Sequence, residues 1–123
     1  MDGNFVKWKD AKIHVLTHAL LYGSSVFEGI HSYMAEKGVA MFRLSDDIER
    51  LFSSAKSFGM NIKFTKPELS GAVKNLIKKN KIKDGYVRPT VYYGYENIGV
   101  YPEGNPTNVA ISAIPWKKYF QET

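Results

Sequence analysis

The segment LTHALLYGSSVFEGIHSY, residues 16–33, decides how this chain folds. It opens with the apolar spacing of an amphipathic helix, and Gly23 interrupts that spacing. The β-branched and aromatic residues that follow predict a strand, yet this strand contains Glu28 and Gly29 directly after Phe27. A carboxylate and a glycine inside the most apolar segment indicate one of two things. Either this is ordinary core with a tight corner, or backbone and rings are arranged around a ligand.

The composition is that of a single globular domain. The chain has 123 residues, 44% of them hydrophobic and 24% charged, which is enough for one core and too little for two. No apolar window is long enough to cross a bilayer, and the N-terminus lacks the apolar region of a signal peptide. Cysteine is absent, so disulfides and thiolate metal sites are excluded. We therefore expect a cytoplasmic protein with no membrane partner.

The net charge of +5 raises the question of nucleic-acid binding. Much of the excess comes from lysines at the end of one predicted helix and just after it, namely Lys74, Lys78, Lys79, Lys81 and Lys83. Lysines in that place complement the helix dipole and keep a surface face solvated. The solvated face is the favoured interpretation, no nucleic-acid partner is expected, and a nucleic-acid module is a distant alternative.

Toward the N-terminus, short strands are predicted at residues 5–8 and 11–15. Asp2-Gly3 is a hairpin-turn signal, but almost nothing precedes it to form the first strand. At the other end an aromatic tail follows Trp116 and is expected to be exposed. Both features suggest that residues 1–123 belong to a longer protein.

Toward the C-terminus, hairpins and helices follow one another without regular βαβ alternation. Ser45 is the expected N-cap of the first long helix and Gly59 its end, and Thr65 with Glu68 forms a capping box for the second. The predicted elements are strands over 26–34 and 39–43 joined by a turn at 36–38, helices over 46–58 and 66–79, and strands over 86–95 and 108–114. This order predicts an α+β fold, an antiparallel or mixed sheet with two helices packed on one face.

The residues that could carry chemistry do not form a complete catalytic set. His14 and His18 have the i, i+4 spacing of helical metal ligands, but His14 falls in a predicted strand and no carboxylate stands at a suitable offset, so structural roles are favoured. Ser24 and Ser25 are not in a nucleophile-elbow pattern, and the glycines are too scattered to cradle a phosphate. Metal binding and acyl transfer therefore have no support.

Two arginines have two interpretations each. Arg50 lies at the margin of a helical apolar stripe, where it either covers apolar surface with its stem or aims its guanidinium at a phosphate or carboxylate. Its position alone favours the first. Tyr86 and Arg88 share one face of a strand, which suits a carboxylate ligand and a wet sheet face equally well.

Four segments together carry a specific resemblance. They are WKDAKIHVLTHALLYGSSVFEGIHSY (8–33), FRLSDDIERLFSSAKSFGM (42–60), YVRPTVYYGY (86–95) and GVYPEG (99–104). In this order they resemble the N-terminal small domain of branched-chain amino acid aminotransferases, which have the class IV fold of pyridoxal-phosphate enzymes. The resemblance extends over nearly all of residues 1–123.

The resemblance implies a pyridoxal 5'-phosphate site and a substrate pocket. Arg50 matches the arginine that holds the cofactor phosphate, and Phe27 an aromatic wall for a branched side chain. Gly29 leaves room for substrate and cofactor, Tyr86 engages the substrate carboxylate, and Arg88 helps to accept the acidic side chain of glutamate. The implied reaction passes an amino group between leucine, isoleucine or valine and 2-oxoglutarate.

The resemblance also implies partners and a second domain. Tyr22 and Val100 match segments that reach into a neighbouring subunit's site, so a homodimer or larger homo-oligomer is expected. His31 stands where many relatives have arginine. The Schiff-base lysine is expected in a larger C-terminal domain beyond Thr123, and neither Lys12 nor Lys56 matches it.

Residues 1–123 are therefore expected to form a single small N-terminal domain without a catalytic residue of its own, inactive in isolation. The alternatives are another class IV enzyme, such as a D-amino acid or aromatic transaminase, and a stand-alone binding module without catalysis.

Overall fold

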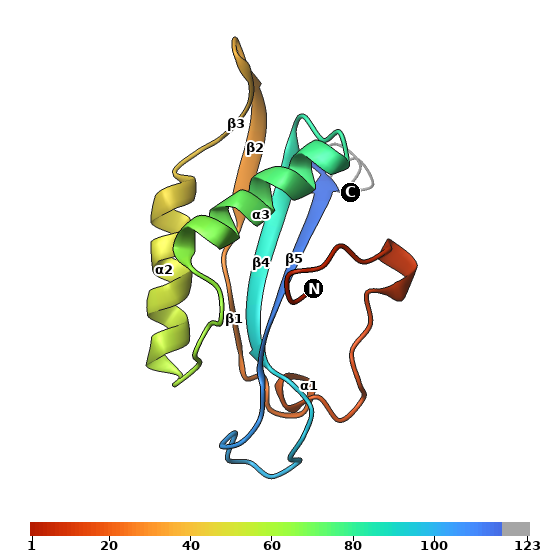
Figure 1. Ribbon diagram of the computed structural model, residues 1–123, viewed down its shortest axis with the longest axis vertical. Coiled ribbons are helices and arrows are strands. Elements are labelled where there is room, and N and C mark those ends of the chain that lie inside the picture. Colours follow the sequence, from red (N-terminus) through yellow and green to blue (C-terminus); the bar gives the residue numbers. More distant parts are fainter. Residues whose placement is uncertain (117–123) are drawn as a thin grey trace.

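Two long helices cover one face of an antiparallel sheet (Figure 1). Within residues 1–116 the opposite face carries no long helix, and we call it the helix-free face. The computed structural model describes residues 1–116, so the predicted aromatic tail after Trp116 lies outside the described residues. The elements are η1 (Trp8–Asp10), α1 (His18–Tyr22), β1 (Ser25–Phe27), β2 (Ile30–Ala35), β3 (Gly38–Met41), α2 (Leu44–Ser57), α3 (Lys66–Lys79), β4 (Gly85–Tyr93) and β5 (Thr107–Pro115). The α+β prediction is confirmed, and every strand pair is antiparallel.

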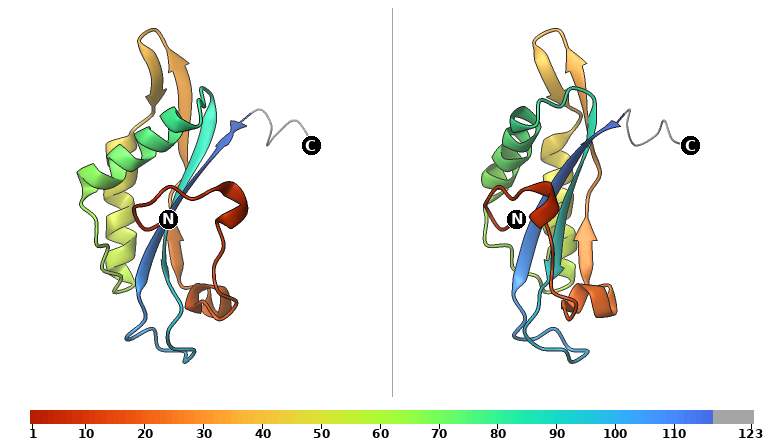
Figure 2. Two further views of the ribbon diagram at one scale, coloured as in Figure 1. Left: turned by 45° about the vertical axis from the view of Figure 1, so that its right-hand side comes forward. Right: turned by 90° about the vertical axis from the view of Figure 1, so that its right-hand side faces the viewer.

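Strand β4 is the centre of the sheet. It pairs with β5 along one side and with both β1 and β2 along the other, and β3 continues the sheet beyond β2. Figure 2 shows the sheet nearly edge-on, with α2 and α3 together on one side of it. The β2–β3 hairpin extends past the helices at one end, and α1 lies with the 96–106 loop at the opposite end (Figure 1).

The predicted single strand over 26–34 is wrong at one point, because the hydrogen-bond ladder breaks between β1 and β2. Pairing of Phe27 with Thr90 and of Ile30 with Val87 keeps one register across the break. Within it, the Glu28 N–H donates to the Pro89 carbonyl at 3.1 Å. Proline has no N–H to donate in return, so the pair is incomplete and the chain is left as two short strands.

The hydrophobic core fills the space between the helices and the covered face of the sheet. Alternate residues of β4 point into it, as the period of two requires. The side chains with almost no exposed surface are Ile30, Ile48, Leu51, Ala55, Val73, Val87 and Val91. Burial of this apolar area is the main term that holds α2 and α3 on the sheet.

The strands predicted at 5–8 and 11–15 are wrong. That stretch contains only η1, and its backbone bonds are local turns such as Asp10 N–H to Lys7 O and Thr17 N–H to His14 O. Its side chains are exposed, because the lysines interleaved with the aromatic residues leave no continuous apolar face to bury. Asp2-Gly3 does form a turn with positive φ at both residues, but it joins no hairpin. Asp2 instead exchanges hydrogen bonds with Val109 of β5.

Of the three predictions for the helix ends, one is wrong and two are confirmed. Helix α2 begins at Leu44, with Arg43 rather than Ser45 as its N-cap, because the longer helix buries Leu44. The capping box of Thr65 and Glu68 is present at α3, and Gly59 follows α2 with a φ of 72°. No helix within residues 1–116 is both long and apolar enough to span a membrane.

Replacement of Leu51 by alanine should lower the free energy of unfolding by about 2–5 kcal/mol, since it opens a cavity at a fully buried position. Urea unfolding followed by circular dichroism measures this change. Ile13→Ala is the control, because Ile13 is of the same size, is 50% exposed and should change the stability by less than about 1 kcal/mol. Equal losses in the two variants would contradict the assigned core.

Candidate functional site

Four residues predicted for the site meet on the helix-free face of the sheet. Register places Phe27 opposite Thr90, and Gly29 falls opposite Arg88 when the same register is continued. The Arg88 guanidinium donates to the Tyr86 hydroxyl from Nε at 3.1 Å and from Nη2 at 2.9 Å. The same group lies over the Phe27 ring, 4.5 Å from its centroid. The alternation in the sequence therefore correctly puts these side chains on one face.

Gly29 is the residue that lets this cluster close. A Cβ atom at position 29 would lie 2.8 Å from the Tyr86 hydroxyl oxygen and 3.0 Å from the nearest ring carbon. Those separations are too short for any side chain, so the phenol of Tyr86 occupies the space that a larger residue would fill. Glycine is needed here for close approach and not for a special backbone angle, since its φ is not positive.

Two aromatic residues extend the cluster along the same face. The Trp116 ring lies 5.0 Å from the His31 ring and 5.9 Å from the Tyr86 ring, between centroids. His31 is the Cα partner of Tyr86, and its imidazole ring stands where the resemblance leads to an arginine. The sequence reasoning missed Trp116 as a neighbour of the site. Trp116 directly follows Pro115, the last residue of β5, and Pro115 pairs with Gly85 at the start of β4. This pairing brings Trp116 close to Tyr86.

Arg50 lies on α2, on the helix side of the same corner, and is held there by two carboxylates. Its Nε and Nη2 donate to the two carboxylate oxygens of Glu28 at 3.2 and 3.1 Å, and Nη2 also donates to Asp47. Glu28 and Asp47 expose only 14% and 10% of their side chains, whereas Arg50 exposes 65%. This is not an arginine lying along an apolar edge, the interpretation that its position alone favours.

The charges of this cluster shift one another's proton affinity. Burial raises the pKa of the Asp47 carboxyl, the Arg50 guanidinium opposes that shift, and the neighbouring Glu28 carboxylate adds to it. The hydrogen bond to Glu28 raises the pKa of the Arg50 guanidinium, with further help from the charges of Glu28 and Asp47. Arg50 therefore stays positively charged. Asp47 is the group in this cluster that burial makes easier to protonate.

The donor set of Arg50 fits a phosphate group. A guanidinium carries five N–H donors, and the bonds above use only those of Nε and Nη2. The two N–H groups of Nη1 have no hydrogen-bond partner within residues 1–116, on a side chain that is largely exposed. Each of these two N–H groups can donate a charge-assisted hydrogen bond to a phosphate oxygen.

Tyr22 and Val100 meet at a different place, the end of the sheet that carries α1. The Tyr22 hydroxyl donates to the Ile98 carbonyl at 2.7 Å. The buried His18 ring has Nε2 3.0 Å from both the Gly99 and Val100 carbonyls and Nδ1 2.7 Å from the Ser24 hydroxyl. His18 thus ties α1 to the 96–106 loop, which is the structural role that the sequence favours. No hydrogen bond or ring contact within the described chain links this place to Phe27.

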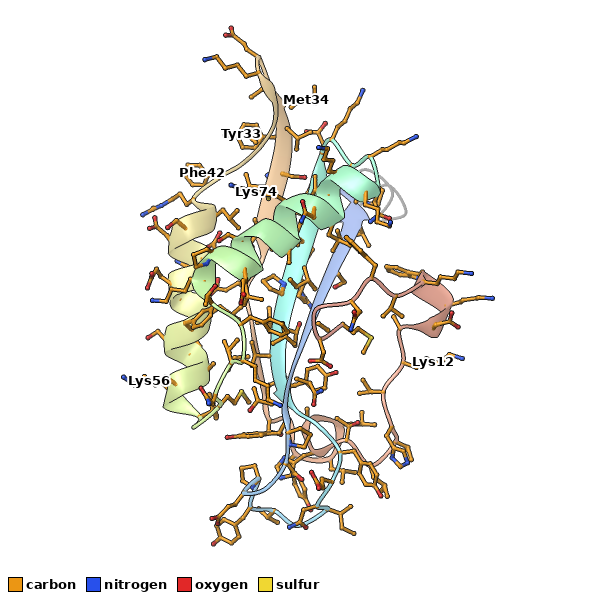
Figure 3. All side chains as sticks on the ribbon, viewed as in Figure 1. Lys12, Tyr33, Met34, Phe42, Lys56 and Lys74 are labelled. Carbon is orange, nitrogen blue, oxygen red and sulfur yellow. The ribbon has the colours of Figure 1, made fainter. Side chains whose placement is uncertain are left out.

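Within residues 1–116 we find no second group of side chains arranged for catalysis. In that part of the chain, no group of three or more histidine and carboxylate side chains could hold a metal ion. Lys12 and Lys56 point outward at opposite sides of the molecule in Figure 3, one from the N-terminal segment and one from the end of α2. Neither forms a hydrogen bond or ion pair with the residues of the site.

The chain belongs to the class IV aminotransferase family. The family model described as "Amino-transferase class IV" matches residues 25–123, which include every site residue above except Tyr22. Among curated proteins, the chain is similar to the branched-chain-amino-acid aminotransferases of Pseudomonas aeruginosa (40% identity) and Escherichia coli K12 (42%). The alignments cover 98% and 96% of this chain and 39% and 38% of those proteins. The chain thus spans about two fifths of the length of these relatives.

Solved structures agree with the sequence relatives. A T.th. branched-chain amino acid aminotransferase complexed with N-(5'-phosphopyridoxyl)-L-glutamate superposes with a TM-score of 0.92 at 43% identity, covering 94% of this chain and 39% of that one. The Escherichia coli branched-chain amino acid aminotransferase gives a TM-score of 0.90 at 42% identity, with the same coverage. The fold described above is therefore that of part of these enzymes.

Replacement of Gly29 by alanine should displace the Tyr86 ring, because the added methyl group would overlap its hydroxyl oxygen. We expect a crystal structure of the variant to show Tyr86 moved and its bonds from Arg88 lost or lengthened. Gly71→Ala is the control, since an added Cβ there meets nothing within 4 Å and lies in α3, where alanine is the better helix former. An unmoved Tyr86 in Gly29→Ala would contradict the assigned role of Gly29.

Proposed function

We propose that residues 1–123 form the small domain of a pyridoxal-phosphate-dependent transaminase that moves an amino group between branched-chain amino acids and 2-oxoglutarate. The observation that carries the proposal is the cluster of Phe27, Tyr86 and Arg88 over Gly29, which offers an apolar wall and two carboxylate-binding groups together. The names of the relatives and their high structural similarity support the same reaction. Bound pyridoxal phosphate would supply the carbonyl group and the electron sink for amino transfer.

Each site residue then has a role that its contacts allow. Arg50 would hold the cofactor phosphate through the N–H groups of Nη1. The Tyr86 hydroxyl accepts both Arg88 bonds, so its own hydrogen is available to donate to the substrate carboxylate that all substrates share. Arg88, beside it, supplies the positive charge for a second carboxylate, on the side chain of glutamate or 2-oxoglutarate.

One pocket can serve two kinds of substrate. The Phe27 ring is 55% exposed and offers apolar contact for the side chain of leucine, isoleucine or valine. The Arg88 guanidinium lies against that ring, so the side-chain carboxylate of glutamate or 2-oxoglutarate would find a cation at the end of the same surface. The amino donor and acceptor can then bind in turn in one place.

We also propose a second domain, a homodimer and a cytoplasmic location. The lysine that would attach the cofactor is assigned to a larger domain outside residues 1–123, consistent with the two-fifths coverage of the relatives. The end of the sheet near α1 carries exposed apolar side chains that a partner subunit would cover, namely Leu20, Leu21, Tyr22, Ile98, Val100 and Tyr101.

Titration of the purified full-length protein with pyridoxal phosphate, followed by borohydride reduction and mass analysis, tests the proposal. We expect one stoichiometric lysine adduct outside residues 1–123, and amino transfer from leucine to 2-oxoglutarate. An adduct on a lysine within residues 1–123 would refute the assignment of domains. Cofactor binding with D-amino acids as the only donors would indicate another class IV enzyme, and no binding at all would indicate a non-catalytic module.

Arg88→Leu should raise the KM for 2-oxoglutarate by at least about tenfold, because hydrogen bonds to a charged group contribute about 1.5–3 kcal/mol. The KM for leucine should change less than about threefold, since the apolar wall of Phe27 remains. Steady-state kinetics with each substrate varied in turn measures both values. Arg43→Leu is the control, because the Arg43 side chain is exposed and pairs with Asp46, away from Phe27, Tyr86 and Arg88. Equal effects on the two substrates would count against the shared pocket.

A further inference from the structure

We propose that Glu28 is a positioning residue for the cofactor phosphate. Together with Asp47, it holds the Arg50 guanidinium in an orientation in which only the N–H groups of Nη1 are left to bind the anion. The identity of the anion rests on the proposed function, whereas the geometry rests on this chain alone. The proposal gives a role to the carboxylate inside the apolar segment, which the sequence could not assign.

The alternation of the strand brings Glu28 to Arg50. Phe27 and Gly29 face the helix-free side, so Glu28 between them faces α2. It binds Nε and Nη2 with both carboxylate oxygens, and Asp47 reaches Nη2 from one turn earlier on α2. Three of the five N–H donors are thereby directed at carboxylates, which leaves the two N–H groups of Nη1 for an anion.

Two nearly buried carboxylates are more than one guanidinium needs for neutralisation. With all three groups ionised, the cluster carries a formal charge of −1, and the nearest further charges, Arg43 and Asp46, pair with each other. An anion that binds Nη1 adds like charge beside the nearly buried Asp47 carboxyl, whose pKa burial already raises, and so favours its protonated form. Anion binding should therefore take up a proton, and the affinity should rise as the pH falls.

Removal of the Glu28 charge has two opposing effects on anion binding. Less repulsion would strengthen binding by about threefold, because the dianion would lie in solvent at the exposed end of Arg50, several ångströms from Glu28, where salt screens the two charges. Loss of the bidentate bond would free the guanidinium to rotate, and misdirected charged hydrogen bonds cost about tenfold or more. Because the second effect is larger, the proposal predicts weaker binding from a change that makes the cluster more positive.

Calorimetric titration of the purified full-length protein, freed of bound pyridoxal phosphate, with sulfate tests this prediction. Sulfate resembles the phosphate group and stays a dianion from about pH 5 to about pH 8, so its own titration does not enter. Glu28→Gln should weaken sulfate binding by about threefold to tenfold. Glu49→Gln is the matched control, since Glu49 neighbours Arg50 on α2 but pairs with Lys66 and should leave the affinity unchanged.

The pH profile separates positioning from a purely structural role. Wild-type affinity should rise toward pH 5, and Asp47→Asn, which removes the proton acceptor, should flatten that slope. If Glu28→Gln does not fold, Asp47→Asn decides by itself, since it also removes one of the two groups that orient Arg50. Equal or tighter sulfate binding by Glu28→Gln, or an unchanged slope in Asp47→Asn, would overturn the proposal.

The outcomes for the function and for the positioning role are distinct. Arg50→Gln tests whether Arg50 binds the anion at all. If this variant binds sulfate as tightly as the wild type, both the positioning role of Glu28 and the phosphate-binding role of Arg50 are wrong. If leucine is not transaminated while Glu28→Gln still weakens sulfate binding, the proposed function fails and the positioning role of Glu28 stands.

Discussion

The rest of the site depends on the two-residue alternation of the chain at Phe27, Glu28 and Gly29. Side chains of consecutive strand residues must point to opposite faces, and here the faces have different neighbours. Two of the three residues face the helix-free side, where Tyr86 and Arg88 lie on β4, and the one between them faces α2. A shift of one residue in this register would exchange the two sets and destroy both halves of the site.

Pro89 interrupts the hydrogen-bond ladder at this point but leaves the strand register unchanged. It stands opposite Glu28, accepts one hydrogen bond and cannot donate the second, so the ladder is weakest at the residue that turns toward Arg50. Beyond the break on either side, Val26 with Val91 and Ile30 with Val87 are paired, and all four side chains are buried. The site corner is therefore a short irregular segment clamped between two well-packed strand pairs, which is how a scaffold holds functional groups in place.

Much of this could be read from the sequence, and what could not be read has physical reasons. Helix α3 was predictable because its signals are local: Thr65 and Glu68 cap each other within one turn. The N-terminal strands were mispredicted because strand formation depends on a pairing partner, and residues 5–15 pair with no strand within the described structure. The pairing of Tyr86 with Arg88 followed from alternation, whereas the contact between Glu28 and Arg50 needed the packing of α2 on the sheet, which no local pattern reports. The resemblance gave the expected role of Arg50 as a phosphate ligand, and the structure gave the orientation of its guanidinium.

The central place of β4 has a consequence for how the molecule reaches this state. Both helices lie between β2 and β4 along the chain, so the contact of Gly29 with Tyr86 closes a long loop, whereas each helix forms from near neighbours. The arginine cluster joins residues that are close in sequence, but the corner that presents Glu28 takes its register from β4. Neither half of the proposed site is therefore complete before β4 has been synthesised. Both halves depend on the pairing of β4 with β1 and β2, so the site forms late in synthesis.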